Sequence, residues 1–170
     1  VIGGITRLTH SGLSMVDWNL FMGAIPPLNE SEWNETFNQY KQFPEYKLKH
    51  FHFTLEEFKG IFFWEYLHRL LGRIIGLVFL IPFLIFWKQG RFDKKTLNNL
   101  WVIFALGGLQ GFLGWFMVKS GLTKDPEVSH YRLATHLITA FSLYCYILWV
   151  ALKLMFPNQK KLNYSFESVK

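Results

Sequence analysis

Hydrophobic residues in this chain gather into three long blocks, and the charged residues lie between them. Residues 100–118 carry no charge, and residues 61–87 and 131–156 form two further apolar blocks. An α-helix rises 1.5 Å per residue, so about 20 apolar residues cross a hydrocarbon core of ~30 Å. The pattern predicts an all-α fold, a multi-pass transmembrane helix bundle, in preference to a soluble bundle with very apolar cores.

The N-terminal string VIGGI is similar to the last turn of an earlier span. We therefore expect one four-helix half whose first helix is mostly missing. The predicted parts are the end of a first transmembrane helix over 1–5, an outer loop with short helices over 6–60, transmembrane helices over 61–87, 98–118 and 131–156, a cytoplasmic loop over 88–97, an outer loop over 119–130 and a cytoplasmic tail over 157–170.

The placement of basic residues predicts the orientation of the spans. Loop 88–97 contains four Lys or Arg residues, the stretch after Phe156 contains three Lys, and loop 119–130 contains two Lys. Positive residues in short loops favour the cytoplasmic side. We therefore expect 88–97 and the C-terminus in the cytoplasm and the long polar segment outside.

The polar segment 6–60 is rich in aromatic rings, which a flexible linker normally lacks. We expect short helices over the membrane face, one starting near Ser31 and another near Thr54. Thr54 and Glu57 have the spacing of a capping box that leads into the next span.

The composition excludes several classes of protein. A chain that is 51% hydrophobic and 19% aromatic is not disordered, and a single cysteine, Cys145, excludes a disulfide scaffold. The net charge of +6 comes from clusters in loops, with no basic stripe interleaved with exposed rings. We therefore expect membrane lipid as a partner and no nucleic acid.

Ionisable residues enter the first part of block 61–87. At 100° per residue, Glu65, His68 and Arg69 fall within about 100° of one another, and Gly72 continues this face. Such residues cost ~2.5–3.5 kcal/mol each near the centre of a span, so they call for a reason. The spacing also allows the simpler interpretation that Glu65 only pairs with Arg69 at i, i+4.

A second ionisable pair, Arg132 and His136, opens the block 131–156 at the same i, i+4 spacing. His68 lies 19 residues and His136 lies 20 residues before the cytoplasmic ends of their blocks. Both rings are therefore roughly 30 Å from the inner interface. Two imidazoles at one depth on helices of the same direction can bind one metal centre, although each alone also fits an interface residue that bonds a carbonyl.

A haem suits paired imidazoles better than a small ion does, because the sequence has no Cys/His or carboxylate cluster for an ion cage. A bis-His haem needs two axial nitrogens, a dry slot and cations for its propionates. The candidates for the propionate contacts are Arg7, Arg69, Arg73 and Arg132.

The remaining notable residues have simpler interpretations. Close helix packing or core packing is expected for Gly107, Gly111, Gly114 and Cys145. Surface or structural roles are expected for His10, His50, His52 and His130.

Long strings along the chain resemble a known family. They are GGITRLTHSGLSMVDW, GAIPPLNESEW, EEFKGIFFWEYLHRLLGR, GGLQGFLGWFMVKSGL and VSHYRLATHL, in order over about residues 1–140. The chain is similar to the haem A synthase family, and its first outer loop, which has no cysteine, resembles the cysteine-free type. Members are eight-helix membrane proteins of two similar halves, and this chain looks like the N-terminal half.

The resemblance implies an oxidoreductase that oxidises the C8 methyl of haem O to a formyl group. This fragment is expected to contain only part of that enzyme. It implies that His68 and His136 are the axial ligands of the haem iron of the substrate, haem O, and that Glu65 is catalytic. It also implies a haem b cofactor, bound mainly by the C-terminal half.

The same resemblance implies a haem O synthase as the supplier of substrate and a role in cytochrome oxidase assembly, within the terminal oxidase pathway. It places the protein in the bacterial inner membrane, in preference to the mitochondrial inner membrane. The residues leave two alternatives open, which are a b-type cytochrome or electron-transfer module without catalysis, and a carrier that delivers haem to an oxidase.

Overall fold

The computed structural model describes residues 2–16, 25–121 and 128–157. These residues form helices and no strand, which confirms the all-α fold. The helices are α1 (Ile2–Leu8), α2 (Glu30–Tyr40), the π-helical turn η2 (Tyr46–His50), α3 (Leu55–Lys88), α4 (Lys94–Gly121) and α5 (His130–Met155). Much of the expected loop 119–130 and nearly all of the expected tail 157–170 lie outside the described residues.

Three helices, α3, α4 and α5, are long and apolar enough to cross a membrane. Most of their large apolar side chains are exposed, as expected for helices that face lipid. These features confirm a multi-pass transmembrane bundle. At 1.5 Å per residue α3 is roughly 50 Å long, so it extends beyond a hydrocarbon core of ~30 Å.

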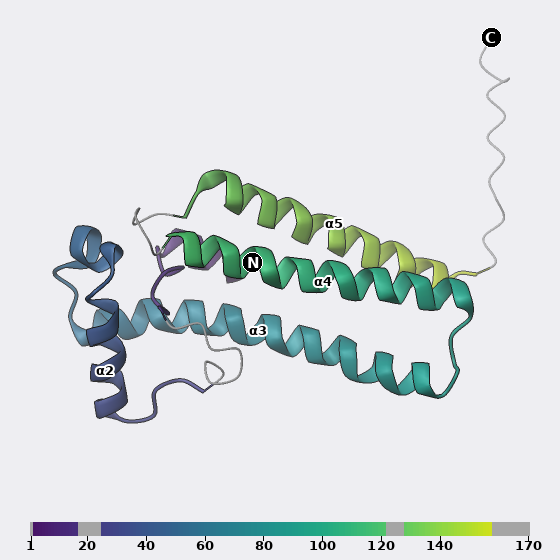
Figure 1. Cartoon of the computed structure of the whole chain (residues 1–170), viewed down its shortest axis with the longest axis horizontal. Coiled ribbons are helices and arrows are strands. Elements are labelled where there is room, and N and C mark those ends of the chain that lie inside the picture. Colours follow the sequence, from purple (N-terminus) through teal and green to yellow (C-terminus); the bar gives the residue numbers. More distant parts are fainter. Residues whose placement is uncertain (1, 17–24, 122–127, 158–170) are drawn as a thin grey trace, which may run out of the picture.

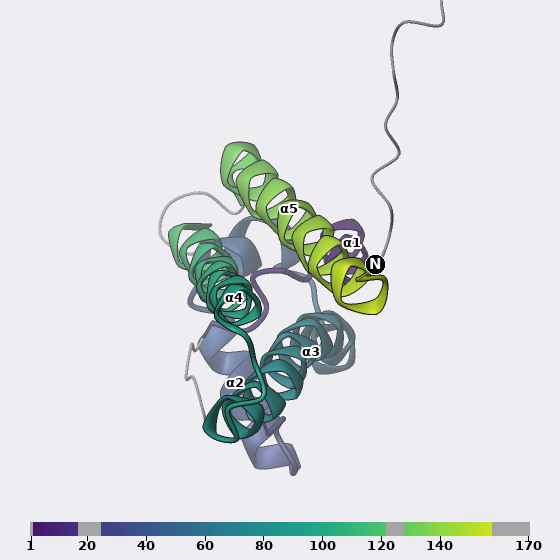
Figure 2. The same ribbon diagram turned by 90° about the vertical axis from the view of Figure 1, so that its right-hand side faces the viewer.

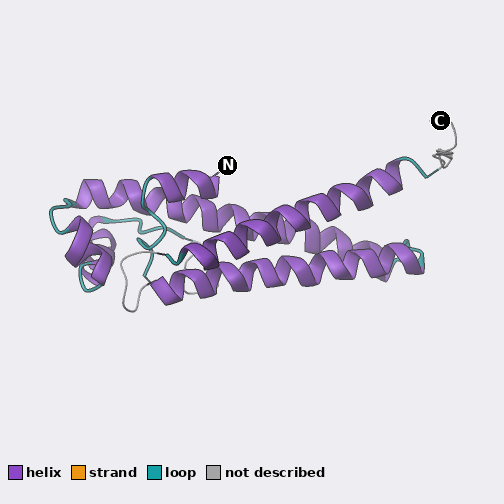
Figure 3. Cartoon of the chain, turned by 90° about the horizontal axis from the view of Figure 1, so that it is seen from above, coloured by secondary structure: helices purple, strands orange, loops and turns teal. Residues whose placement is uncertain are grey.

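The long helices lie side by side along the length of the molecule (Figure 1). α4 packs against both α5 and α3, and α1 packs against α3. Viewed along the bundle, α1 lies between α3 and α5, in the position of a fourth helix (Figure 2). Figure 3 shows the short helical segments gathered at the end of the bundle away from the end of α5.

Local sequence explains where α2 and α3 begin. The hydroxyl of Thr54 accepts a hydrogen bond from the Glu57 amide at 3.4 Å, and the Glu57 carboxylate accepts one from the Thr54 amide at 2.7 Å. The expected capping box is therefore confirmed. The side chain of Asn29 accepts a bond from the Glu32 amide at 2.9 Å, so α2 begins beside the predicted position, Ser31.

The main apolar core of the described residues lies around the first turns of α3 rather than between the spans. Phe37 and Tyr40 of α2 each stack on Phe58 of α3, with ring centroids 5.0 Å apart. The other members of this core are Met15, Ile61 and Phe62. Aromatic pairs add to the apolar area that they bury, so these rings hold α2 on α3.

Tyr40 of this core contacts two buried polar side chains, Glu45 and His50, and we call the three residues the Tyr40 cluster. The Tyr40 hydroxyl donates to Glu45 Oε2 at 3.1 Å and lies 2.7 Å from Nδ1 of His50. One hydroxyl carries one proton, so in this arrangement Nδ1 of His50 donates to the Tyr40 oxygen. Burial raises the pKa of Glu45 from 4.5 to about 8 and lowers the pKa of His50.

The raised pKa of Glu45 predicts that alkaline pH weakens this part of the fold. The stability that neutral Glu45 provides is full below pH 4.5 and is lost as the pH rises through about 8. We expect Glu45→Gln to raise the stability of the segment at pH 9 by on the order of 2 kcal/mol, with little change at pH 5. Thermal unfolding followed by the fluorescence of Trp33, which packs against this core, measures the effect.

The matched control is Glu35→Gln, because Glu35 is an exposed carboxylate on α2. It should change neither curve by more than about 0.5 kcal/mol. Equal responses of the two variants at pH 9 would contradict the burial of an ionisable Glu45.

Candidate functional site

Glu65 is a buried carboxylate on α3, with 2% of its surface exposed. Its Oε2 accepts hydrogen bonds from the Ser14 hydroxyl at 2.8 Å and the Met15 amide at 2.7 Å. Its Oε1 accepts one from Nη2 of Arg69 at 2.5 Å, so the i, i+4 pair that the spacing allows is present. A buried carboxylate requires such partners, because it has lost its hydration.

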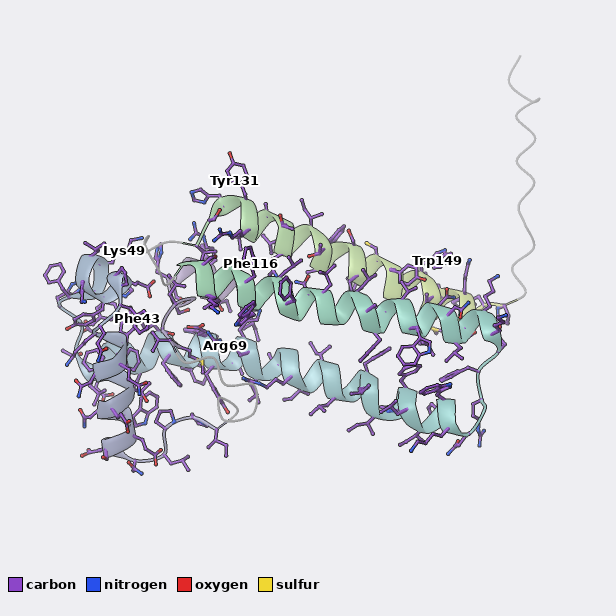
Figure 4. All side chains as sticks on the ribbon, viewed as in Figure 1. Phe43, Lys49, Arg69, Phe116, Tyr131 and Trp149 are labelled. Atoms are coloured by element: carbon purple, nitrogen blue, oxygen red, sulfur yellow. The ribbon has the colours of Figure 1, made fainter. Side chains whose placement is uncertain are left out.

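Arg69 also donates to the backbone oxygen of Met15 at 3.0 Å. Glu65 and Arg69 thus bind both the amide and the carbonyl of one residue in the turn that follows α1. The turn is thereby fixed on α3, and α1 is held beside the same part of that helix. Figure 4 shows Arg69 of α3 and Phe116 of α4 near the same end of the bundle.

His68 lies one turn after Glu65 on α3 and is half-buried. A Cβ on Gly3 of α1 would lie 3.2 Å from Nε2 of His68, whereas a Cβ on Gly4 would meet nothing within 4 Å. Gly3 therefore allows α1 to approach the imidazole more closely than a larger residue would.

The ring of His136 likewise lies against a glycine, Gly114 of α4. A Cβ on Gly114 would lie 3.2 Å from Cε1 of this ring. Nε2 of Gln110 lies 3.0 Å from Nδ1 and 3.2 Å from Nε2 of the ring, and it donates to the His136 backbone oxygen at 3.0 Å. The ring is therefore held from one side by α4.

The two imidazoles belong to α3 and α5, which do not pack extensively on each other. They precede the ends of their helices, Lys88 and Met155, by nearly equal numbers of residues. Both rings thus lie at one end of the bundle at similar depth, and their service as axial ligands remains a prediction.

Ligands for a bare metal ion do not gather in the described parts of the chain. Within residues 2–16, 25–121 and 128–157, no three His, Cys, Asp or Glu side chains lie together in a way that could hold an ion. The chemistry available at this end of the bundle is therefore that of two separate imidazoles and one paired carboxylate.

The four arginines of the predicted site differ in their surroundings. Arg69 is bound within the Glu65 network, and Arg7 is exposed at the end of α1. The guanidinium of Arg132 lies over the ring of Phe116, 4.8 Å from its centroid. Nη1 of Arg73 is buried and has no hydrogen-bond partner among the described residues. Arg73 is therefore the arginine with a buried N–H group that can still donate a hydrogen bond.

Several residues of this site carried no functional expectation from the sequence. Gln110 is the only strongly polar residue in the run 100–118, and that exception was the available signal. Gly114 was expected to serve helix packing, and its close neighbour is the His136 ring. Ser14 and Met15 carry no local signal, because they lie 51 and 50 positions from Glu65 in sequence.

This architecture defines a class of protein, the multi-pass membrane proteins that place ionisable side chains at one end of an apolar bundle. Within that class the chain belongs to the COX15-CtaA family, described as cytochrome oxidase assembly protein, whose family model matches residues 1–168.

Curated relatives are similar over nearly the whole of this chain. The protein named "Heme A synthase" of Flavobacterium psychrophilum is 54% identical over 164 residues, which are 95% of this chain and 48% of that protein. Its namesake from Rhodospirillum centenum is 56% identical over 157 residues, which are 92% of this chain and 42% of that protein. These matches confirm the resemblance to the haem A synthase family.

The chain spans about half the length of the curated relatives it matches. No solved structure matches it significantly.

The Glu65 network predicts that Arg69 is important for stability. Arg69→Met leaves Glu65 buried without a charge partner and removes a bond to Met15, so we expect a loss of about 3–5 kcal/mol. Unfolding of the detergent-solubilised protein by denaturant measures it.

The control is Lys59→Met, which removes the exposed ion pair of Lys59 with Glu56 on the same helix. That pair should contribute under about 1 kcal/mol. Similar losses in both variants would refute a special role for the buried network.

Proposed function

We propose that this chain is the N-terminal, substrate-haem half of a haem A synthase, an oxidoreductase that converts the C8 methyl of haem O to a formyl group. The observation that carries the proposal is the pair of half-buried imidazoles, His68 and His136, on two spans at one end of the bundle. The name of the relatives and the half-length match support it. The haem b cofactor is assigned mainly to a C-terminal half.

The residues at this end fit a haem as substrate. The haem, when bound, supplies the iron and the methyl group that is oxidised. His68 and His136 provide two axial nitrogens from opposite helices, and the apolar residues of the spans limit access of water. Gly3 and Gly114 let a neighbouring helix approach each ring closely, at Nε2 and Cε1 of His68 and at Cε1 of His136.

Arg73 is the arginine that best fits a haem propionate. Its buried Nη1 lacks an acceptor among the described residues, and a charge-assisted bond to a carboxylate would supply one. Arg69 already donates a hydrogen bond to Glu65. Arg132 lies over the ring of Phe116, and Arg7 is exposed.

We assign Glu65 the role of handling protons beside the reacting methyl. The carboxylate lies one turn from His68 and accepts three hydrogen bonds, two at Oε2 and one at Oε1. A carboxylate has about four lone-pair sites, so Oε1 retains room for a water or a proton. Its fixed position makes Glu65 a suitable proton acceptor at one stated atom.

The cellular setting follows from the same assignment. The three apolar spans and the bacterial relatives support a location in the bacterial inner membrane. Haem O would come from a haem O synthase, and the product would enter terminal oxidase assembly. Apolar substrate and product both suit transfer within the lipid.

The proposal is tested on the intact purified protein with added haem O. We expect His68→Ala and His136→Ala each to abolish the low-spin bis-His spectrum, because one axial nitrogen is lost. Glu65→Gln should keep the spectrum and reduce formation of formyl haem by at least about 100-fold. Absorption spectra and chromatographic analysis of extracted haem measure both effects.

His130→Ala is the matched control, because His130 is an exposed histidine of the same helix as His136. It should leave binding and conversion unchanged. A wild-type protein that binds haem O without converting it would favour the b-type cytochrome. One that shows no haem spectrum and no conversion of added haem O would favour the assembly or transport protein.

A methyl group added beside each ring provides a finer test. Gly3→Ala and Gly114→Ala place a methyl 3.2 Å from an imidazole, so each should displace that ring and weaken haem binding about tenfold. Gly4→Ala and Gly111→Ala add the same methyl where nothing lies within 4 Å and should not weaken it. Haem titration measures all four, and equal affinities would show that the glycine seats do not set the ring positions.

A further inference from the structure

Gln110 is a polar side chain in the middle of the apolar helix α4, and its amide is fully engaged with two residues of α5. Nε2 lies beside the ring and the backbone oxygen of His136, and Oε1 lies 2.7 Å from the hydroxyl of Thr139. A side-chain amide is costly inside a span unless it is bonded in this way. The arrangement therefore links the His136 ring to Thr139 through one amide.

Counting protons gives two arrangements of this network. The Thr139 hydroxyl has one proton but three acceptors in reach, which are Oε1 of Gln110 at 2.7 Å, the Thr135 carbonyl at 2.8 Å and the His136 carbonyl at 3.1 Å. If the proton goes to Gln110, Nε2 of Gln110 must face the ring as a donor. If it goes to a backbone carbonyl, the amide can turn over and present Oε1 to the ring.

Only the second arrangement suits a ring that binds metal through Nε2. Such an imidazole carries its proton on Nδ1 and needs an acceptor for it. The end of the Gln110 amide lies 3.0 Å from Nδ1 and 3.2 Å from Nε2 of His136, so it contacts both ring nitrogens. When iron takes Nε2, the turned amide provides the acceptor for Nδ1 alone. Thr139 then accepts from Nε2 of Gln110 and donates to the His136 carbonyl at 3.1 Å, which has lost its Gln110 donor. The turned amide oxygen must also move away from this carbonyl, because both are acceptors.

We propose that Gln110 is the positioning residue of His136, and that its side-chain carbonyl accepts the Nδ1 proton and so leaves Nε2 free for haem iron. The inference rests on the proposed function. Thr139 acts as the pivot, because its hydroxyl can either donate to the amide or accept from it. Gly114 completes the seat by allowing the ring to approach α4.

The test uses Gln110→Leu and Gln110→Glu in the intact protein titrated with haem O. Leucine removes the acceptor, so haem affinity should fall by about 10–100-fold. Glutamate keeps an oxygen at the same distance along the side chain whether it is ionised or neutral, so affinity should recover to within about threefold of wild type. The reduction potential of the bound haem should be lowest in Gln110→Glu and highest in Gln110→Leu, because a stronger acceptor makes the imidazole a stronger electron donor.

Asn99→Leu is the matched control. Asn99 of α4 accepts a hydrogen bond from the Tyr146 hydroxyl of α5 at 3.1 Å, so its loss also breaks a polar contact between the same helices. This variant should leave affinity and potential unchanged. An equal loss of haem affinity in Asn99→Leu, or no loss in Gln110→Leu, would overturn the inference. Gln110 would then only contribute to the packing of α4 on α5.

A second measurement does not depend on haem. The ¹⁵N shifts of the His136 ring in the haem-free protein should report one neutral tautomer in the wild type and a mixture in Gln110→Leu, and identical spectra would contradict the proposal. Failure of the proposed haem-binding function would be distinguishable from failure of the positioning role, because His136→Ala would then bind haem as the wild type does. If His136→Ala loses haem and Gln110→Leu does not, only the positioning role fails.

Discussion

One buried carboxylate, Glu65, holds together the part of the molecule on which the site depends. It binds Ser14 and Met15 from the turn after α1, and it pairs with Arg69 on its own helix. The network fixes the turn that follows α1, and α1 itself packs directly on the same helix, α3. Gly3 of α1 lies close to Nε2 and Cε1 of the His68 ring, so α1 and the network meet the same part of α3.

Both imidazoles pack against a glycine of a neighbouring helix, but their polar neighbours differ. Each lies against a glycine on a neighbouring helix, which removes the side chain that would otherwise displace the ring. His136 is further fixed by an amide from α4, whereas His68 sits next to a charged pair. The two rings therefore have unequal electrostatic surroundings, which suits a site that binds one ligand and also moves protons.

Much of the fold could be predicted because its signals are local. Block length predicted the spans, and the Thr54 capping box and the helix near Ser31 followed from short-range pairs. The equal depth of His68 and His136 came from counting residues along helices of known rise. The Ser14 and Met15 contacts to Glu65 and the seat of His136 on Gly114 depend on tertiary packing between distant residues, which no local pattern records.

An experimental density map of the intact protein with bound haem O tests the central claim most directly. The account predicts iron between His68 and His136, with both rings directed into the bundle. Iron bound elsewhere, or either imidazole turned towards lipid, would contradict it.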